Sequence, residues 1–440
     1  TALQSEIEFG QASVYLLKAK RADVKNNLIR TLEHFNRARA LMSQTDDPSY
    51  EGRSQIDFYR ASAFLMMSSI ENRRANLDSV RQILERVAPI VSKNPKNNYL
   101  ANYYLTSAEY YIEKSSLEDH WANLERARMK LDKLEEIDKD GSRARESLEL
   151  MQSYYSNLAL YVDPVTNMRR ALELSDSAAK FLGENEHAQK VHRASQALLL
   201  SQKALNEEPI KNLNAAIEGF KETLLHLDSI MMPYAYARIQ SNLGRAYLML
   251  AYHTDTIQNT ESAMAYLDES LEYLGKHDNI PMSALSLNLY ADCLRLRGSK
   301  NNNSDEIAVA LDSLKKALNI LSREDYPEIY STIQLTRGQV LANLGEFQKD
   351  DRIFRDAYRA FGASAEHFDP DDNPRAYCEV LLEIARCDLG RAISMKNERY
   401  AKQAVNTLQR ILDNISKDEY PLLFAQAKKE MLRAEEFQSR

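Results

Sequence analysis

Histidines and cysteines are the residues of this chain that could bind a metal ion or act as nucleophiles. His187 and His192 are five residues apart, about 140° around a helix, so they do not share a face as two zinc ligands at i and i+4 would. Cys378 and Cys387 are nine residues apart, on opposite faces of a helix, and no CxxC pair is present. We therefore interpret the histidines as exposed or packing residues, and the cysteines as small buried apolar residues.

One acidic segment resembles a calcium loop in its alternating side-chain oxygens, Asp369-Pro-Asp-Asp-Asn373. Pro374 stands where such a loop needs a glycine, and Val380 stands where it needs a bidentate glutamate. The chain also has no GxGxxG, Walker, GxSxG or HExxH motif. We therefore expect no metal, no cofactor and no catalytic site, and predict a protein that acts by binding.

The composition indicates a helical protein. The 440 residues include only 12 Gly and 11 Pro, too few for an all-β protein, which needs a turn roughly every ten residues. With 44% hydrophobic and 28% charged residues, the chain can bury a core and is not disordered. It contains no apolar run long enough to cross a membrane.

Charge and cysteine usage limit the partners and leave the compartment open. The formal net charge is -7, and neither half of the chain is basic, so we expect no nucleic-acid binding. Three cysteines cannot form a disulfide framework. The localisation is therefore unknown, with the cytoplasm slightly favoured, and export is compatible with a signal peptide removed before Thr1.

A repeat is marked by the prolines. Seven of the eleven fall on a period of about 47 residues, with two positions skipped near Ser142 and Glu186: Pro48, Pro95, Pro233, Pro281, Pro327, Pro374 and Pro421. Each period holds two apolar-periodic segments of about seventeen residues separated by a polar break. Because proline suits the first turn of a helix, we predict that it begins the first of two helices in each unit.

The breaks inside the units carry helix-start residues. Residues 116–119, 163–164 and 304–307 each offer a capping side chain followed by acidic residues or proline. Such side chains accept hydrogen bonds from the free N–H groups of a first helical turn. We therefore expect Ser116, Asp163 and Ser304 to cap the second helices that follow them.

The second helices share a small residue, a large apolar residue four positions later, and further small or apolar residues at seven and eight. These spacings lie on one helix face, where small residues allow close helix approach. The positions are Ala216, Phe220, Thr223 and Leu224; Ala263, Leu267, Ser270 and Leu271; Ala310, Leu314, Ala317 and Leu318; Ala357, Phe361, Ser364 and Ala365; Ala404, Leu408, Ile411 and Leu412; and Ala127, Leu131 and Leu134.

The first helices complete the pattern. Residues 237–247 read Ala-Arg-Ile-Gln-Ser-Asn-Leu-Gly-Arg-Ala-Tyr, and residues 332–338 repeat the Gln and the Gly at the same offset from proline. Ala291 and Ala385 replace this glycine in the neighbouring units. Together with the second helices, this resembles the tetratricopeptide repeat. The match is clear in 233–420 and degenerate in 1–232, and the period is about 47 residues instead of 34.

The predicted fold is all-α: a right-handed α-solenoid superhelix of about nine helix-turn-helix, tetratricopeptide-like repeats plus a C-terminal capping helix. In such an array we expect each repeat to contact only its neighbours. The predicted units are 1–47, 48–94, 95–141, 142–185 and 186–232 in an N-terminal part (1–232); 233–280, 281–326, 327–373 and 374–420 in a C-terminal part (233–420); and 421–440 as a capping helix or half-repeat.

The resemblance also implies a binding surface. In a tetratricopeptide superhelix the first helices line a concave groove, and fixed positions around the repeat glycine point inward. We expect the groove-lining residues to be polar, with mixed charge signs, and suited to a peptide backbone or carboxylate. They are Arg238, Asn242, Arg245, Asn288, Asp292, Arg295, Thr336, Gln339, Glu379, Glu383 and Arg386.

These features predict a non-catalytic scaffold or adaptor that docks a protein segment or peptide in its concave groove. Such a protein could belong to a multi-protein assembly. Two alternatives remain open: a ligand-gated regulator that senses a small peptide or nucleotide, and the sensing region of a larger protein whose effector domain lies outside this sequence. The convex face is an alternative docking surface to the groove.

Overall fold

The computed structural model describes residues 2–43, 50–93, 97–139, 141–276, 279–368, 370–371 and 373–439. All regular secondary structure in these residues is helical. The 19 helices are α1 (Ala2–Ala19), α2 (Val24–Met42), α3 (Tyr50–Ser68), α4 (Arg73–Lys93), α5 (Asn97–Ser115), α6 (His120–Ile137), α7 (Ala144–Leu158), α8 (Pro164–Ala179), α9 (Glu186–Lys203), α10 (Pro209–His226), α11 (Pro233–Ala251), α12 (Thr256–Lys276), α13 (Ile280–Asn301), α14 (Ser304–Ile320), α15 (Pro327–Gln348), α16 (Asp351–Ala365), α17 (Pro374–Met395), α18 (Glu398–Asn414) and α19 (Pro421–Gln438).

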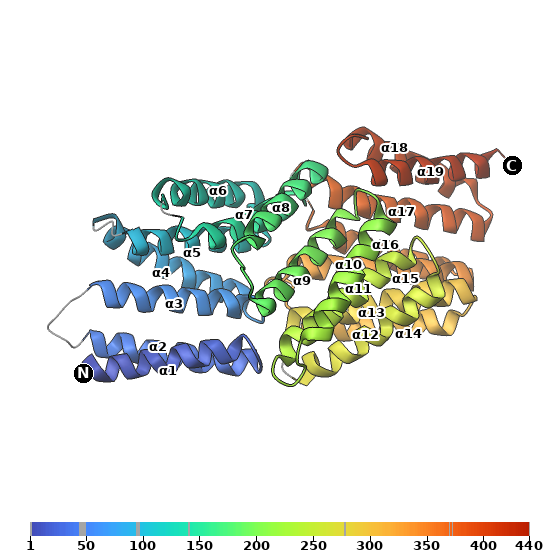
Figure 1. Cartoon of the computed structure of the whole chain (residues 1–440). Coiled ribbons are helices and arrows are strands. Elements are labelled where there is room, and N and C mark those ends of the chain that lie inside the picture. Colours follow the sequence, from blue (N-terminus) through green and yellow to red (C-terminus); the bar gives the residue numbers. More distant parts are fainter. Residues whose placement is uncertain are drawn as a thin grey trace.

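The helices form nine consecutive pairs followed by the single helix α19, which confirms the predicted α-solenoid. Each helix packs mainly against its neighbours in sequence, and the first helices of successive pairs also contact one another, as α11 does with α13 and α15 with α17. The first helices therefore form the inner wall of the superhelix. Figure 1 shows α1 to α7 stacked on one side and α9 to α19 on the other, with α8 leading between them.

Proline begins first helices where the period requires it. Pro233, Pro327, Pro374 and Pro421 each start their helix, and Pro281 is the second residue of α13. At the two skipped positions, α7 and α9 begin at Ala144 and Glu186. Pro48 and Pro95 lie outside the described residues, and the division into repeat units stays a prediction.

The contact between paired helices depends on the predicted small residues. In the second helices, every residue at the first position of the signature is buried: Ala127, Ala216, Ala263, Ala310, Ala357 and Ala404. A Cβ at Gly244 would lie 2.7 Å from Leu267 Cγ, and a Cβ at Gly338 would overlap the Phe361 ring. These glycines therefore allow α11 to approach α12 and α15 to approach α16.

A recurrent asparagine organises the connection inside each of the first six pairs. Its side-chain amide donates to the backbone carbonyl five residues earlier, over 2.6–2.8 Å. The residue four positions before it has a positive φ, between 37° and 47°. We call the asparagine whose side chain donates this hydrogen bond the loop asparagine. The six loop asparagines are Asn27, Asn76, Asn123, Asn167, Asn212 and Asn259.

The last three pairs use a different connection, which corrects one predicted cap. A residue with positive φ, at Asn302, Lys349 or Lys396, ends the first helix. The next residue then caps the second helix with its side chain, so Asn303 and not Ser304 caps α14, by accepting from Glu306 N. The predicted cap at Asp163 is confirmed, since its carboxylate accepts from Thr166 N. The predicted cap at Ser116 was wrong: α6 begins after Asp119, and the Ser116 hydroxyl donates to Glu113 O instead.

Contacts also form between parts of the superhelix far apart in sequence, so the expectation that repeats touch only their neighbours was wrong. Tyr326 Oη donates to Ser68 O over 3.2 Å, and Tyr420 Oη donates to Tyr161 O over 3.3 Å. The Arg74 backbone N–H donates to Asp325 Oδ1 over 3.0 Å. One superhelical turn thus brings loops of the N-terminal pairs onto the helix starts of C-terminal pairs. We call these hydrogen bonds the cross-turn contacts.

No helix among the described residues has the length and apolar character that a membrane span requires.

Candidate functional site

The first helices of the C-terminal pairs each present one polar residue at the same register. Arg245, Asp292, Gln339 and Arg386 follow one another at intervals of 47 residues on α11, α13, α15 and α17, and Arg433 occupies the corresponding place on α19. Small residues just before them, such as Gly244 and Gly338, pack toward the second helices. The repeat therefore places polar side chains, both charged and neutral, along the inner wall.

A cavity of about 680 Å³ opens on this wall between α11, α15, α17 and α19 and the loop after α9. A second cavity of about 140 Å³ shares Tyr252, Gln339, Glu383 and Arg386 with it. We call the two together the inner cavity. The predicted groove residues that line it are Arg295, Gln339, Glu379, Glu383 and Arg386.

The deepest charged group beside this cavity is the pair of Arg295 and Asp292. Arg295 Nε donates to Asp292 Oδ1 over 2.8 Å, and its Nη2 donates to Tyr252 Oη over 2.7 Å. Tyr252 Oη in turn donates to Asp292 Oδ2 over 2.5 Å. Burial lowers the pKa of Arg295, but Asp292, Tyr252 and Glu383 together outweigh burial and raise the pKa of Arg295 overall. This group is satisfied within the chain and holds α11 and α13 together.

Two further arginines are paired on α17. Arg386 Nη1 donates to Glu383 Oε1 over 2.5 Å, and its Nε donates to Glu430 Oε1 over 3.3 Å. Arg375 Nε donates to Glu379 Oε1 over 2.9 Å. Burial lowers the pKa of Arg386, whereas Glu383 and Glu430 raise it, with a net rise. The wall of the inner cavity thus carries charges of both signs.

The remaining predicted groove residues have different environments. Arg238 is exposed, Asn242 and Arg245 are half-buried, and Asn288 and Thr336 are buried. Thr336 Oγ1 donates to the backbone of its own helix over 3.2 Å, and Asn288 Oδ1 is buried with no hydrogen-bond partner among the described residues. The structure therefore brings about half of the predicted set to one cavity, and whether they bind a partner stays a prediction.

Several cavity residues were missed by the sequence analysis. Tyr252 and Arg375 lie at the ends of first helices, outside the positions carried over from the tetratricopeptide pattern. Glu430 lies on α19, 47 residues after the predicted residue Glu383, and could have been found by extending the register of Glu383. No sequence signal marks residues 204–206, because the loop after α9 reaches the cavity through superhelical closure.

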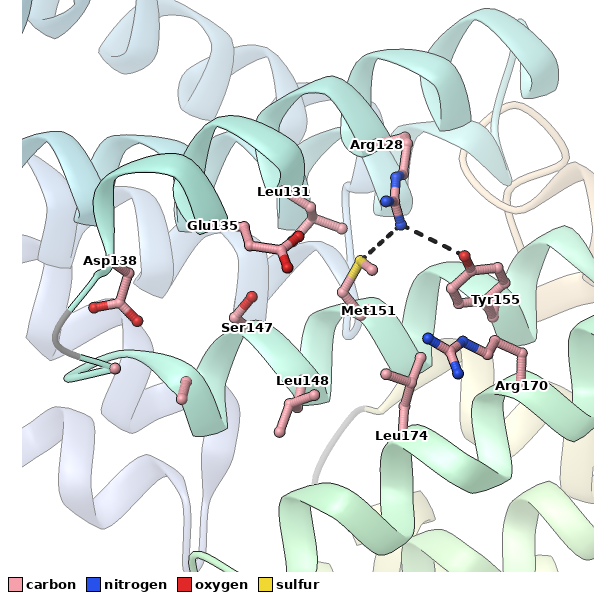
Figure 2. A pocket seen from close by; sticks show the side chains of 12 residues that line it. Arg128, Leu131, Glu135, Asp138, Ser147, Leu148, Met151, Tyr155, Arg170 and Leu174 are labelled. Atoms are coloured by element: carbon pink, nitrogen blue, oxygen red, sulfur yellow. Dashed lines mark hydrogen bonds between the residues drawn. The ribbon is translucent and has the colours of Figure 1, made fainter.

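A separate cavity of about 420 Å³ lies between α6, α7 and α8 (Figure 2). Arg128 points across it, with Nη1 3.3 Å from Met151 Sδ and 3.5 Å from Tyr155 Oη. Arg128 also pairs with Asp132, at 2.8 Å. None of the residues that line this cavity was predicted as a binding residue, and the guanidinium of Arg128 is already paired with a carboxylate.

The cysteines and histidines do not form a reactive site. Cys293, Cys378 and Cys387 are buried and free, and burial raises the pKa of Cys378 to about 11 and of Cys387 to about 12. No cluster of three metal-ligating side chains is present among the described residues. The side chain of His187 and the residues Asp369 and Asp372 of the acidic segment lie outside them.

No protein-family model matches this chain, and no curated protein matches it in sequence. Solved structures of similar fold include RapI in its apo form, which is 12% identical with a TM-score of 0.51 over 98% of both chains. Yeast Tom70 is 11% identical with a TM-score of 0.28, over 98% of this chain and 96% of its own. A circular tandem repeat protein is 13% identical with a TM-score of 0.21, over 100% of this chain and 98% of its own.

At 12% identity the similarity to RapI concerns the fold alone, and the other two TM-scores are too low to add to it. Together with the nine helix pairs and the buried small-residue contacts, it defines the class. The chain is a tetratricopeptide-like helical repeat protein.

Proposed function

We propose that this chain is a non-catalytic protein-binding scaffold that docks a protein segment or peptide in the inner cavity. The observation that carries the proposal is the cavity of about 680 Å³ on the inner wall, lined by paired charges and by the half-buried Leu335 and Leu423. Pockets that combine apolar area with a few placed polar groups are typical of peptide and ligand sites. Extended peptides offer both chemistries along their length.

A cross-linking experiment tests this proposal. Gln426 is exposed and lines the cavity, whereas Val309 is 53% exposed on the second helix α14, outside it. A photo-reactive amino acid at position 426 should attach to one contiguous segment of a partner from the source cells, and the synthetic segment should compete. The same group at position 309 should attach to nothing that the segment displaces. Attachment at 309 alone would move the site to the convex face.

A second function, the ligand-gated regulator, is favoured by the cross-turn contacts. Residues 204–206 of one half and Arg375, Tyr420 and Leu422 of the other line the same cavity. Tyr420 also donates the hydrogen bond to Tyr161 that joins the halves. A ligand in the cavity would therefore contact Tyr420, whose hydrogen bond holds the two halves together. Gating requires that a ligand binds the open and the closed form of the superhelix with different affinity.

Small-angle scattering distinguishes the two functions. If the chain is a gated regulator, the radius of gyration should change when the cross-linked segment is added as a saturating synthetic peptide. If it is a scaffold, the radius should stay constant within error while the peptide binds. The Tyr420→Phe variant should shift the unliganded radius only in the first case.

A further inference from the structure

An apolar stripe runs along the outer face of α1. Leu3, Ile7, Val14 and Leu17 are each between 50% and 69% exposed. They lie on the side of the helix opposite to Ala12, which is fully buried against α2. Figure 1 shows α1 and α2 at the edge of the N-terminal stack. Contiguous exposed apolar side chains on a soluble protein mark an interaction surface.

The spacing of this stripe is that of a helix-packing seam. Leu3, Ile7, Gly10, Val14 and Leu17 follow one another at alternating intervals of four and three residues. These are the intervals between the a and d positions of a coiled coil, where one helix packs along another. A Cβ at Gly10 would meet nothing within 4 Å, so the middle of the stripe is an open hole. We call these five residues the α1 seam.

The other end of the helix array has no comparable stripe. The outer face of α19 exposes charged residues such as Lys428, Arg433 and Glu436, with Leu432 as a single large apolar residue among them. The end repeats of a solenoid need such a polar outer face to stay soluble by themselves. The outer face of α1 is therefore built like that of a helix that packs against another helix.

The charges beside the α1 seam match a second copy of the same helix in antiparallel orientation. Glu6 and Lys20 are both exposed and lie two heptads apart, on the same side of the seam. In an antiparallel pair, Val14 of each copy would face the hole at Gly10 of the other, and Glu6 of each would lie beside Lys20 of the other. A parallel pair would set Gly10 against Gly10 and would keep Glu6 far from Lys20.

We propose that the α1 seam is a homodimer interface, at which two copies of this chain pair antiparallel about a two-fold axis. A two-fold contact uses the same surface twice, so it can match the apolar residues and the charges of the seam without any other protein. No residue of the α1 seam lines the inner cavity. The inference therefore goes beyond the proposed function, and the dimer would present two inner cavities.

Sedimentation equilibrium of the full chain tests the interface. The apparent mass of the parent chain should rise from 50.4 kDa toward twice that value as the concentration increases. Val14→Glu should weaken the association at least about tenfold, because dimerisation would bury the new carboxylate. Val309→Glu changes a valine that is 53% exposed on α14, and should leave the association unchanged. Circular dichroism checks that both variants stay folded.

Either of two results would overturn the inference. One is a parent chain that stays at the monomer mass at submillimolar concentration, which would mean that something other than a second copy covers the seam. The other is a Val14→Glu variant that associates as tightly as the parent chain.

A charge exchange tests the pairing of Glu6 with Lys20. Glu6→Lys and Lys20→Glu should each weaken self-association by about threefold to tenfold, since each places like charges together twice in the dimer. An equimolar mixture of the two variants should regain the affinity of the parent chain, because each supplies the charge that the other lacks. A mixture that associates no better than either variant alone would contradict the antiparallel pair.

Cross-linking tests the position of the two-fold axis. Gln11 and Gln4 are both exposed beside the seam, but only Gln11 would lie near the axis, next to its own copy. The native cysteines are buried, so a short bis-maleimide should join two chains of the Gln11→Cys variant and leave Gln4→Cys monomeric. Equal cross-linking of the two variants would overturn the proposed arrangement.

Discussion

At the scale of single residues, the fold depends on a few positions where a side chain would not fit. Gly338 is the clearest, since a Cβ there would overlap the Phe361 ring, which is fully buried. The opposite case is Gly362 on the following helix, where a Cβ would meet nothing within 4 Å. Two glycines of neighbouring helices therefore have opposite roles.

We expect Gly338→Ala to lower the free energy of unfolding by about 1–3 kcal/mol, because α15 must move away from Phe361. Gly362→Ala should raise it by up to about 1 kcal/mol, since alanine favours the helical backbone and meets no obstacle. Urea unfolding followed by circular dichroism measures both. If both substitutions stabilise the chain, the close approach of α15 and α16 is not required.

Asp388 shows the cost of a buried carboxylate. It is 5% exposed, and Tyr358 Oη donates to its Oδ1 over 2.5 Å. Burial raises the pKa of Asp388 from 3.8 to about 6, although Tyr358 and Arg391 act in the opposite direction. The folded chain therefore holds this proton more tightly than the unfolded chain does.

The protonated Asp388 carboxyl stabilises the fold below pH 4, and this stabilisation is lost as the pH rises through about 6. The neutral Asp388→Asn variant should therefore gain stability over the parent chain between pH 4 and pH 7, by up to about 3 kcal/mol. Asp312→Asn, at an exposed position, should show no such trend. A pH-independent difference for Asp388→Asn would contradict the raised pKa.

At the scale of helices and loops, two kinds of connection divide the solenoid. The first six pairs use the loop asparagine, and the last three use a capping residue after a left-handed helix end. Both satisfy backbone groups that a helix end leaves free. Because the loop asparagine donates to a backbone carbonyl inside a tight turn, we expect its loss to leave that carbonyl without this hydrogen bond.

Asn212 and Asn214 on α10 offer a matched test of this role. Asn212 is buried and donates to Glu207 O over 2.6 Å, whereas Asn214 is exposed. Asn212→Ala should cost about 1–3 kcal/mol of unfolding free energy, and Asn214→Ala should cost nothing or stabilise slightly. Thermal unfolding of the two variants gives the comparison. Equal effects would mean that the connection does not depend on the asparagine.

Many of the helix starts and helix contacts could be predicted from the sequence. The prolines predicted the first helices because their fixed φ and missing N–H suit a helix start, and the small residues predicted the helix contacts. Five of the six loop asparagines recur with about the same period in the N-terminal part, where the tetratricopeptide pattern is degenerate, and could have marked those repeats. The cap at α14 was misplaced by one residue because Asn303 and Ser304 are both good capping residues.

The candidate site was only partly predictable. The register placed Gln339, Glu383 and Arg386 on the inner wall because it depends on helical geometry alone. It could not tell that Arg295 is satisfied by Tyr252, since that contact depends on the spacing of adjacent helices. Residues 204–206 reach the cavity because small rotations between many successive helix pairs add up along the superhelix. No local sequence pattern encodes this arrangement.

At the scale of the whole molecule, the cross-turn contacts link repeats of the solenoid that are not neighbours in sequence. Tyr326 and Tyr420 are 3% and 4% exposed, and each donates to a backbone carbonyl of the N-terminal half. A linear array would unfold in parts, because each repeat would sense only its neighbours. With these contacts, the N-terminal pairs and the C-terminal pairs share a boundary.

We expect the parent chain to unfold in one transition whether it is followed by circular dichroism or by the fluorescence of Trp121, the single tryptophan, which lies on α6. The double variant Tyr326→Phe, Tyr420→Phe loses two hydrogen bonds of about 1 kcal/mol each. Its fluorescence transition should separate from its dichroism transition. Coincident transitions in the double variant would mean that the cross-turn contacts do not couple the halves.

The length of chain enclosed by the cross-turn contacts has a kinetic consequence. The hydrogen bonds of Tyr326 and Tyr420 close segments of 258 and 259 residues, whereas helix pairs form through contacts close in sequence. Loop closure of this length is entropically slow and is expected after the pairs have formed. The two tyrosines should therefore affect how fast the folded chain opens more than how fast it forms, so the lifetime of the closed superhelix can change without a change in the repeats themselves.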